Sequence, residues 1–257
     1  MKKFLFPLTI IICFYVSSCA TITKDTLYQT STIDALLAGV YDGDLTLGQL
    51  KKHGDFGLGT FDHLDGEMIL LDGNIYQVKA DGKVYTPALS SKTPFATVCE
   101  FTPNKTILIK EGTDYKSFEK LIDENISNKN LFYAIKITWQ FKSMKTRSVP
   151  PQQKPYPPLL EATSKQSVFN MENISGTIVG FRCPPYVNGI NVPGYHLHFI
   201  SSDNIRGGHV LNFETSKDIC EIDILDRFFL QLSVNAKDFA KTDLSKDRTK
   251  ELQGVEK

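Results

Sequence analysis

The stretch Gly194-Tyr-His-Leu-His-Phe-Ile decides how the second half of the chain folds, and Gly207-Gly-His follows it within a few residues. Side chains two positions apart on a β-strand point to the same face, so His196 and His198 can aim both imidazoles at one point. The leucine and phenylalanine beside them then pack on the opposite face. The polar and glycine residues that follow predict a turn, and an antiparallel return would bring His209 back alongside the pair.

Three imidazoles that converge and leave a fourth position open are the plan of a catalytic metal site. The alternative is a hairpin whose histidines are exposed or hydrogen-bonded, because an HxH pair by itself is weak support for a metal. The flanking apolar pattern and the return of His209 favour the metal site. The two other histidines, His53 and His63, have no such partners, and we expect both in surface loops.

Strand signals dominate the rest of the chain. Apolar runs separated by Asp-Gly turns between residues 57 and 87 are typical of a β-meander. Further strands are predicted at residues 96–101, 106–109, 131–141, 175–182, 194–201, 209–214 and 218–232, the last with a bulge or turn near Asp226. Helices are predicted at residues 31–41, 46–53 and 115–124, and 246–253 is helical or disordered. We therefore predict a mixed α/β (α+β) fold, dominated by sheets with a few flanking helices.

The strand at residues 131–141 alternates apolar and polar side chains, which places one set on a single face: Tyr133, Ile135, Ile137 and Trp139. After it, five prolines between Val149 and Pro158 exclude a central strand or a helix interior. We interpret that segment as the crossover between two sheet-centred halves, with the metal site between them.

The predicted organisation has four parts. A signal peptide occupies residues 1–18 and an N-terminal sheet domain residues 19–148. The proline-rich crossover is at residues 149–158. A C-terminal metal-binding domain, which includes an active-site tail, spans residues 159–257. At the start of the first domain, residues 20–31 are expected to form a linker or an edge strand.

The first residues have the features of an export signal. Lys2 and Lys3 precede an almost wholly apolar run, Phe4 to Val16, which is too short to cross a bilayer comfortably. The following Ser17-Ser18-Cys19 looks like the end of a bacterial lipobox, in which Cys19 carries the lipid. The alternative is an ordinary cleaved signal with a chance cysteine. We expect an exported, membrane-anchored lipoprotein, periplasmic or at the cell surface.

Composition limits the partners and the disulfides. The chain has 29 basic and 29 acidic residues, so no basic excess indicates a nucleic-acid partner. Cys99, Cys183 and Cys220 lie beyond the leader, an odd number that allows one disulfide and one thiol and leaves the pairing open. No CxxC pair occurs, which argues against a cysteine zinc site.

Two further residues are ambiguous from their local sequence. Glu67 enters an apolar strand, and a glutamate in that position ordinarily faces solvent. Arg147 would ordinarily belong to a basic loop before the prolines, although arginine suits bidentate binding of a carboxylate. Neither residue stands out without a wider comparison.

Several motifs in the same order resemble the α-acetolactate decarboxylase family. They are Thr26-Leu-Tyr-Gln-Thr-Ser-Thr, His53-Gly-Asp-Phe-Gly-Leu-Gly-Thr-Phe, Leu64-Asp-Gly-Glu-Met, Lys145-Thr-Arg-Ser-Val-Pro-Pro-Gln and the two histidine motifs. The resemblance runs from about residue 25 to the end. It implies a dimeric two-sheet enzyme that converts 2-acetolactate to acetoin and CO2. The lipobox departs from the pattern, since many members are cytoplasmic.

The resemblance also implies roles for individual residues. The zinc ligands would be His196, His198 and His209. Glu67, Arg147 and Glu256 would act on the substrate, and Thr60 would line the pocket. Glu251 is the runner-up for the glutamate near the C-terminus, because spacing in the tail is loose.

The chemistry that the resemblance implies suits these residue types. Zn²⁺ would chelate the ketone and hydroxyl oxygens of the substrate and stabilise the enediolate left when CO2 departs. A carboxyl group would then deliver a proton. Two alternatives stay open at this point. One is another three-histidine metalloenzyme that acts on a small oxygenated substrate, and the other is an exported metal-binding lipoprotein without turnover.

Overall fold

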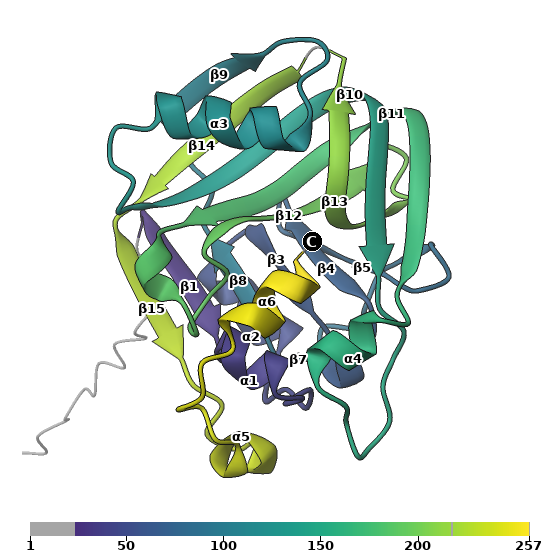
Figure 1. Cartoon of the computed structure of the whole chain (residues 1–257), viewed down its shortest axis with the longest axis vertical. Helices are drawn as coiled ribbons and strands as arrows, with labels where there is room; N and C mark the ends of the chain where they lie inside the picture. The colour runs from purple at the N-terminus through teal and green to yellow at the C-terminus, as the bar shows by residue number, and fades with distance from the viewer. Residues whose placement is uncertain (1–23, 217, 257) are drawn as a thin grey trace, which may run out of the picture.

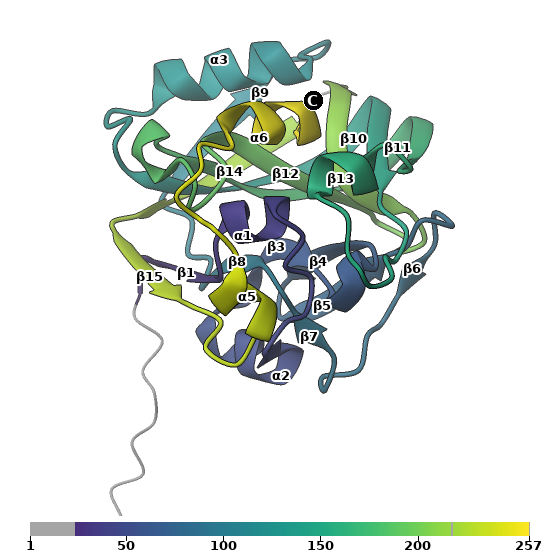
Figure 2. The ribbon, with the colours of Figure 1, turned by 60° about the horizontal axis from the view of Figure 1, so that its bottom comes forward.

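The computed structural model describes residues 24–216 and 218–256, which form two β-sheets packed face to face (Figures 1 and 2). The first sheet has seven strands in the order β15-β1-β8-β3-β4-β5-β6, antiparallel except for the pair β1–β15. Its strands are β1 (Thr26–Thr30), β3 (Phe56–Thr60), β4 (Glu67–Leu71), β5 (Asn74–Val78), β6 (Val84–Tyr85), β8 (Ala96–Cys99) and β15 (Arg227–Gln231).

The second sheet has six antiparallel strands in the order β11-β12-β13-β10-β14-β9. They are β9 (Lys105–Ile109), β10 (Phe132–Ser148), β11 (Ser167–Cys183), β12 (Gly194–Ser201), β13 (Gly207–Thr215) and β14 (Asp218–Leu225). β10 and β11 also pair directly with each other, so β10 to β13 form a closed circuit of pairings. A separate two-stranded sheet joins β2 (Leu45–Thr46) to β7 (Lys92–Thr93).

The helices cover the sheets in distinct places. They are α1 (Ile33–Leu37), α2 (Leu47–Leu50), α3 (Tyr115–Asn125), α4 (Leu159–Thr163), α5 (Lys237–Lys241) and α6 (Thr249–Val255). Buried apolar residues of α3 pack on the outer face of the second sheet, and those of α2 pack on the outer face of the first. A third cluster fills the space between the sheets. The helices α1, α4 and α6 share a fourth cluster at one open side of this sandwich (Figure 2). The predicted sheet-dominated α/β class is confirmed.

In the long strand β10, the alternation of apolar and polar residues predicted most, but not all, of the side chains on the buried face. Tyr133, Ile135 and Ile137 pack in the cluster under α3, as predicted. The prediction was wrong for Trp139, which is 66% exposed. Its backbone has a φ of 150°, far from the usual strand value, and it lies between the stretch of β10 that pairs with β14 and the stretch that pairs with β13. Phe141 resumes the buried face.

The predicted crossover at 149–158 does not join the two sheets. The strands on either side of it, β10 and β11, both belong to the six-stranded sheet. The chain instead changes sheet between β8 and β9, and it returns at Asp226, where the expected break separates β14 from β15. The strands β9 and β10, which the prediction assigned to the N-terminal domain, therefore belong to the second sheet. The prolines mark where the chain leaves a sheet, because proline has no N–H to donate to a neighbouring strand. They do not specify which sheet the chain enters next.

The predicted edge strand at 20–31 is also placed differently, because β1 lies between β15 and β8. The first helix is shorter than the predicted 31–41. The Thr32 side chain caps α1 by accepting from the N–H of Ala35, and Gly39 with a φ of 93° follows its end.

The predicted signal peptide and lipidated Cys19 lie outside the described residues. Cys99, Cys183 and Cys220 are buried free thiols, so no disulfide joins any of the three. Across 24–216 and 218–256, every helix is too short or too polar to traverse a bilayer.

Candidate active site

Strand pairing alone sets three of the predicted site residues in one row. His198 on β12 lies directly opposite His209 on β13, and His209 lies opposite Arg147 on β10. The backbones of β13 and β10 approach closely at Gly208, where an added Cβ would lie 2.4 Å from the carbonyl oxygen of Arg147. Gly208 also has a φ of +130°, which disfavours other residues. The Gly-Gly before His209 therefore lets this histidine reach its place in the row.

The three predicted metal ligands converge as the strand spacing predicted. His196, His198 and His209 each offer a nitrogen within 4.8 Å of the other two. Leu197 and Phe199 point to the opposite face and pack under α3. His198 and His209 are 1% and 2% exposed, while His196 is less completely buried.

The hydrogen bonds of these histidines fit a cation. His198 Nδ1 lies 2.8 Å from the carbonyl oxygen of Met68, which as an acceptor fixes the proton on Nδ1 and leaves Nε2 with its lone pair. That Nε2 atom and His209 Nδ1 are buried without a hydrogen-bond partner among the described residues. Burial, aided by the positive charge of Arg147, lowers the pKa of His196 to about 3. Burial likewise lowers the pKa of the other two well below the usual value. Neutral imidazole is the form that binds metal, so this group could hold a metal ion.

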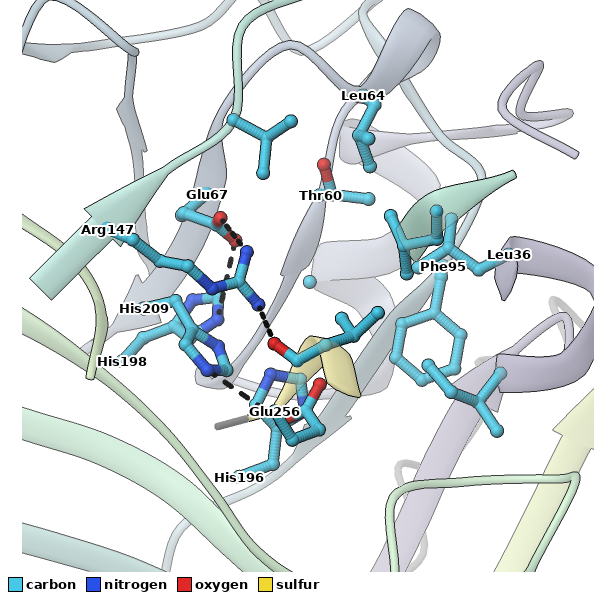
Figure 3. Close-up of a pocket in the computed structure, with 15 residues that line it drawn as sticks. Leu36, Thr60, Leu64, Glu67, Phe95, Arg147, His196, His198, His209 and Glu256 are labelled. Carbon is cyan, nitrogen blue, oxygen red and sulfur yellow. Dashed lines mark hydrogen bonds and ion pairs between the residues drawn. The ribbon is translucent and has the colours of Figure 1, made fainter. Parts of the chain in front are cut away.

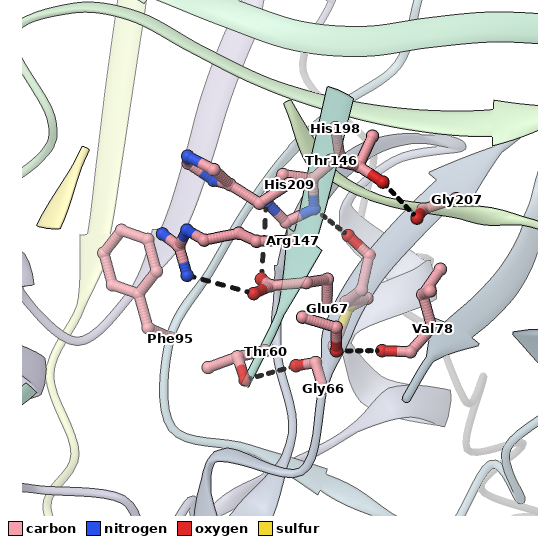
Figure 4. A network of polar contacts seen from close by, with 12 residues as sticks. Thr60, Gly66, Glu67, Val78, Phe95, Thr146, Arg147, His198, Gly207 and His209 are labelled. Carbon is pink, nitrogen blue, oxygen red and sulfur yellow. Dashed lines mark hydrogen bonds and ion pairs between the residues drawn. The ribbon is translucent and has the colours of Figure 1, made fainter. Parts of the chain in front are cut away.

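The first sheet supplies the opposite wall through Thr60 and Glu67, which face each other across β3 and β4. Glu67 is 7% exposed rather than facing solvent, as a glutamate at such a position ordinarily would. Its Oε1 lies 3.2 Å from Arg147 Nη1 and its Oε2 lies 3.6 Å from His198 Nε2 (Figure 4). The Thr60 hydroxyl donates to the carbonyl oxygen of Gly66 at 2.7 Å, which holds the turn that leads into Glu67.

Arg147 connects both sheets to α6. It is 4% exposed, and its Nη2 donates to the carbonyl oxygen of Val255 at 3.3 Å. Its Nε–H is buried without a partner among the described residues, so one donor is free for a ligand. The next residue, Glu256, places Oε2 3.7 Å from His209 Nε2. Glu251, the alternative tail carboxylate, instead pairs with Arg248 and does not line the cavity.

Both cavity glutamates have perturbed pKa values. Burial raises the pKa of Glu67 to about 7, against the lowering effect of Arg147 and with a further raising effect of Glu256. Burial also raises the pKa of Glu256 to about 7, again against Arg147. Positive charge bound at the histidines would lower both values.

All seven predicted active-site residues line one cavity of about 40 Å³ (Figure 3). In Figure 3, Glu256 lies beside His196 and His209, whereas Thr60 and Leu64 lie farther from the histidines. The sequence did not indicate the apolar part of the lining, formed by Ile33, Leu36, Leu64, Phe95, Val149, Leu159 and Val255. These residues come from separate segments, and nothing in their type distinguishes a cavity wall from a core.

The fold and the site together define a two-sheet protein with a buried three-histidine group, beside an arginine and two glutamates, that could hold a metal ion. Residues 27–246 match the family described as Alpha-acetolactate decarboxylase. The chain therefore belongs to the α-acetolactate decarboxylase family, and it is an enzyme of the carboxy-lyase class. This membership confirms the predicted family and decides against a lipoprotein without turnover.

Individual relatives agree with this assignment. An alpha-acetolactate decarboxylase from Methanosarcina mazei is 50% identical over 234 residues, which cover 91% of this chain and 81% of the relative. One from Bacillus subtilis is 43% identical over 232 residues, 90% of each chain. The crystal structure of alpha-acetolactate decarboxylase from Bacillus subtilis strain 168 superposes with a TM-score of 0.88 at 42% identity, and covers 90% of this chain and 99% of that one.

Proposed function

We propose that this enzyme decarboxylates 2-acetolactate to acetoin and CO2, with Zn²⁺ held by His196, His198 and His209. The observation that carries the proposal is one buried cavity in which three neutral imidazoles converge beside an arginine and two glutamates. Zinc is preferred because three imidazoles with an open position are a ligand set of catalytic zinc. When bound, the cation supplies Lewis-acid chemistry, drawing electron density from substrate oxygens.

Arg147 binds and orients the anionic end of the substrate. Its guanidinium is held by Glu67 and by the carbonyl of Val255, and its Nε–H has no partner among the described residues. A planar, permanently charged group in a buried cavity suits a carboxylate or a developing oxyanion. The bond to the carboxylate breaks there, CO2 departs, and the electron pair stays on the remaining four-carbon unit.

The four-carbon unit becomes acetoin by taking up one proton at carbon. Glu67 reaches the histidines from β4, and Glu256 reaches them from the position that follows α6. A carboxyl group beside the reacting atoms can hold the proton and release it to carbon. The apolar side chains of the lining, which include Leu36 and Leu159, exclude bulk water from this step.

The direct test measures acetoin formed from racemic 2-acetolactate by the purified chain. We expect turnover that is lost on chelation and restored by Zn²⁺, with about one zinc per chain by elemental analysis. Equal rates in metal-free protein would exclude the metal, and no acetoin from zinc-loaded protein would exclude the activity. A different three-histidine enzyme would show the second result.

We also propose that the enzyme is exported, tethered through lipid on Cys19, and works as a homodimer. Support for the tether comes from residues 1–19, where two lysines and an apolar run precede the lipobox. Cys19→Ser should lose lipid labelling and leave the membrane fraction or stay unprocessed. Unchanged membrane association of a wild-type chain that carries no lipid would exclude the anchor. A monomer in sedimentation experiments would exclude the dimer.

A further inference from the structure

The cavity around the histidines is too small for the proposed substrate. Its volume is about 40 Å³, and a single buried water needs roughly 10–15 Å³ of such space. A five-carbon acid with four oxygens is much larger than the few waters that this space admits. If the proposed function is correct, one wall of the cavity must therefore move before the substrate binds.

A much larger groove of about 670 Å³ lies on the other side of one wall. Its lining residues come from the start of α3, the segment at 188–195, β13 and α6. Glu256 is the residue common to the linings of the cavity and the groove, within the part of the chain that the structure describes. The Glu256 side chain therefore borders both spaces.

This wall is held less firmly than the others. The histidines, Arg147, Thr60 and Glu67 all stand on paired strands. Glu256 follows α6, a helix of seven residues that is anchored through Leu252 and Val255. Its carboxylate lies 3.7 Å from His209, beyond hydrogen-bond distance, and it has no side-chain hydrogen bond within the described residues. Displacing it breaks fewer contacts than displacing a strand.

We propose that the groove is the passage by which small carboxylate substrates reach the histidines, and that the Glu256 side chain is the gate between them. Glu256 moves away from His209 to join the two spaces, and its return encloses the substrate. Gln253 on α6 and Asn212 on β13 form walls of the passage, and both are exposed. The lining has Lys116 but also Asp114 and Glu119, so we expect passage to depend on width rather than on electrostatic steering.

The test narrows the passage without touching the cavity. Gln253→Trp places a large side chain in the groove, and Lys250→Trp is the matched control, because Lys250 is exposed on the same helix but does not line the groove. The first readout is the rate at which diethyl pyrocarbonate modifies His196 and His209 in the full, metal-stripped chain, followed by mass spectrometry. His63, whose side chain is 57% exposed, is the internal reference.

We expect Gln253→Trp to slow modification of His196 and His209 at least about fivefold, with His63 unchanged, and Lys250→Trp to stay within about twofold of wild type. The kcat/KM for 2-acetolactate should fall in parallel. The labelling does not depend on turnover. A wild-type chain that is inactive on 2-acetolactate would therefore refute the proposed function, and the labelling rates would still test the passage.

Equal labelling of both tryptophan variants would overturn the passage. If Gln253→Trp fails to fold, Asn212→Trp on the facing strand provides the same comparison. Unslowed labelling of the cavity histidines in a folded Asn212→Trp chain would likewise overturn it.

Discussion

The histidine cavity has two sides that are built in different ways. On one side, His198, His209 and Arg147 stand in a row whose spacing comes from backbone pairing across three strands. On the other side, Glu256 follows a seven-residue helix whose position depends on packing against α1 and α4. Backbone hydrogen bonds between strands fix the spacing of the side chains whatever those side chains contact. A short helix, by contrast, has little stability of its own without tertiary packing. We therefore expect metal binding to depend on the strands, and the later chemistry to depend on the helix as well.

The largest effect is expected on the strand side, from His198→Ala. It removes a proposed ligand that is held by the carbonyl of Met68. We expect loss of bound zinc and a decrease in acetoin formation of more than about 10³-fold, because the cation depends on all three imidazoles. Elemental analysis and an acetoin assay measure the two effects. His63→Ala, at an exposed histidine outside the cavity, should change neither. Full zinc occupancy in His198→Ala would remove this residue from the metal site.

The same contrast explains how much of the site could be predicted from the sequence. The positions of His196, His198 and His209 followed from the two-residue period of a strand and one turn, both local properties. The same rule failed for Trp139, which is exposed and has an unusual backbone φ of 150° that the sequence does not indicate.

The remaining site residues depend on contacts between distant segments. Glu67 is buried because Arg147 reaches it from the other sheet, 80 residues away. Local pattern therefore favoured a solvent-facing glutamate, and only the family resemblance brought Glu67 and Arg147 to the site. The composition of the tail does not indicate its packing, yet Leu252 and Val255 are buried in the cluster that seats α6.

On the helix side, Glu256→Gln tests the proposed proton donor while keeping the shape of the side chain. We expect zinc content and thermal stability to stay near wild type and kcat to fall about 10²-fold, the usual contribution of a positioned acid or base. Glu251→Gln is the control, because that carboxylate pairs with Arg248 outside the cavity. Wild-type turnover of Glu256→Gln would leave proton delivery to Glu67. Deleting residues 251–257 is a less specific test, since it also removes the buried Leu252 and Val255.

Arg147→Lys weakens the contacts by which Arg147 joins the strand side of the cavity to α6. Lysine keeps the charge but loses the planar fork that contacts Glu67 with Nη1 and the carbonyl of Val255 with Nη2. We expect kcat/KM to fall at least about tenfold, or roughly 1.4 kcal/mol of transition-state stabilisation. Arg182→Lys is a matched change at a buried arginine that contacts Asp123 and the carbonyl of Lys129 away from the cavity. If both variants keep normal kinetics, Arg147 does not act on the substrate.

The smallest effect is expected at Thr60, on the strand side of the first sheet. Thr60 lines the cavity, but its hydroxyl already donates to the carbonyl oxygen of Gly66, so we assign it to holding the turn before Glu67. Thr60→Val keeps the shape and leaves that carbonyl without its partner, which should cost about 1 kcal/mol of the free energy of unfolding. A turn that loses one hydrogen bond but keeps its strand pairing should displace Glu67 little, so kcat/KM should fall less than about threefold. Thr60→Ser retains the hydroxyl and should recover the activity of wild type. A tenfold loss of kcat/KM in Thr60→Val with unchanged stability would assign the hydroxyl to the substrate instead of the turn.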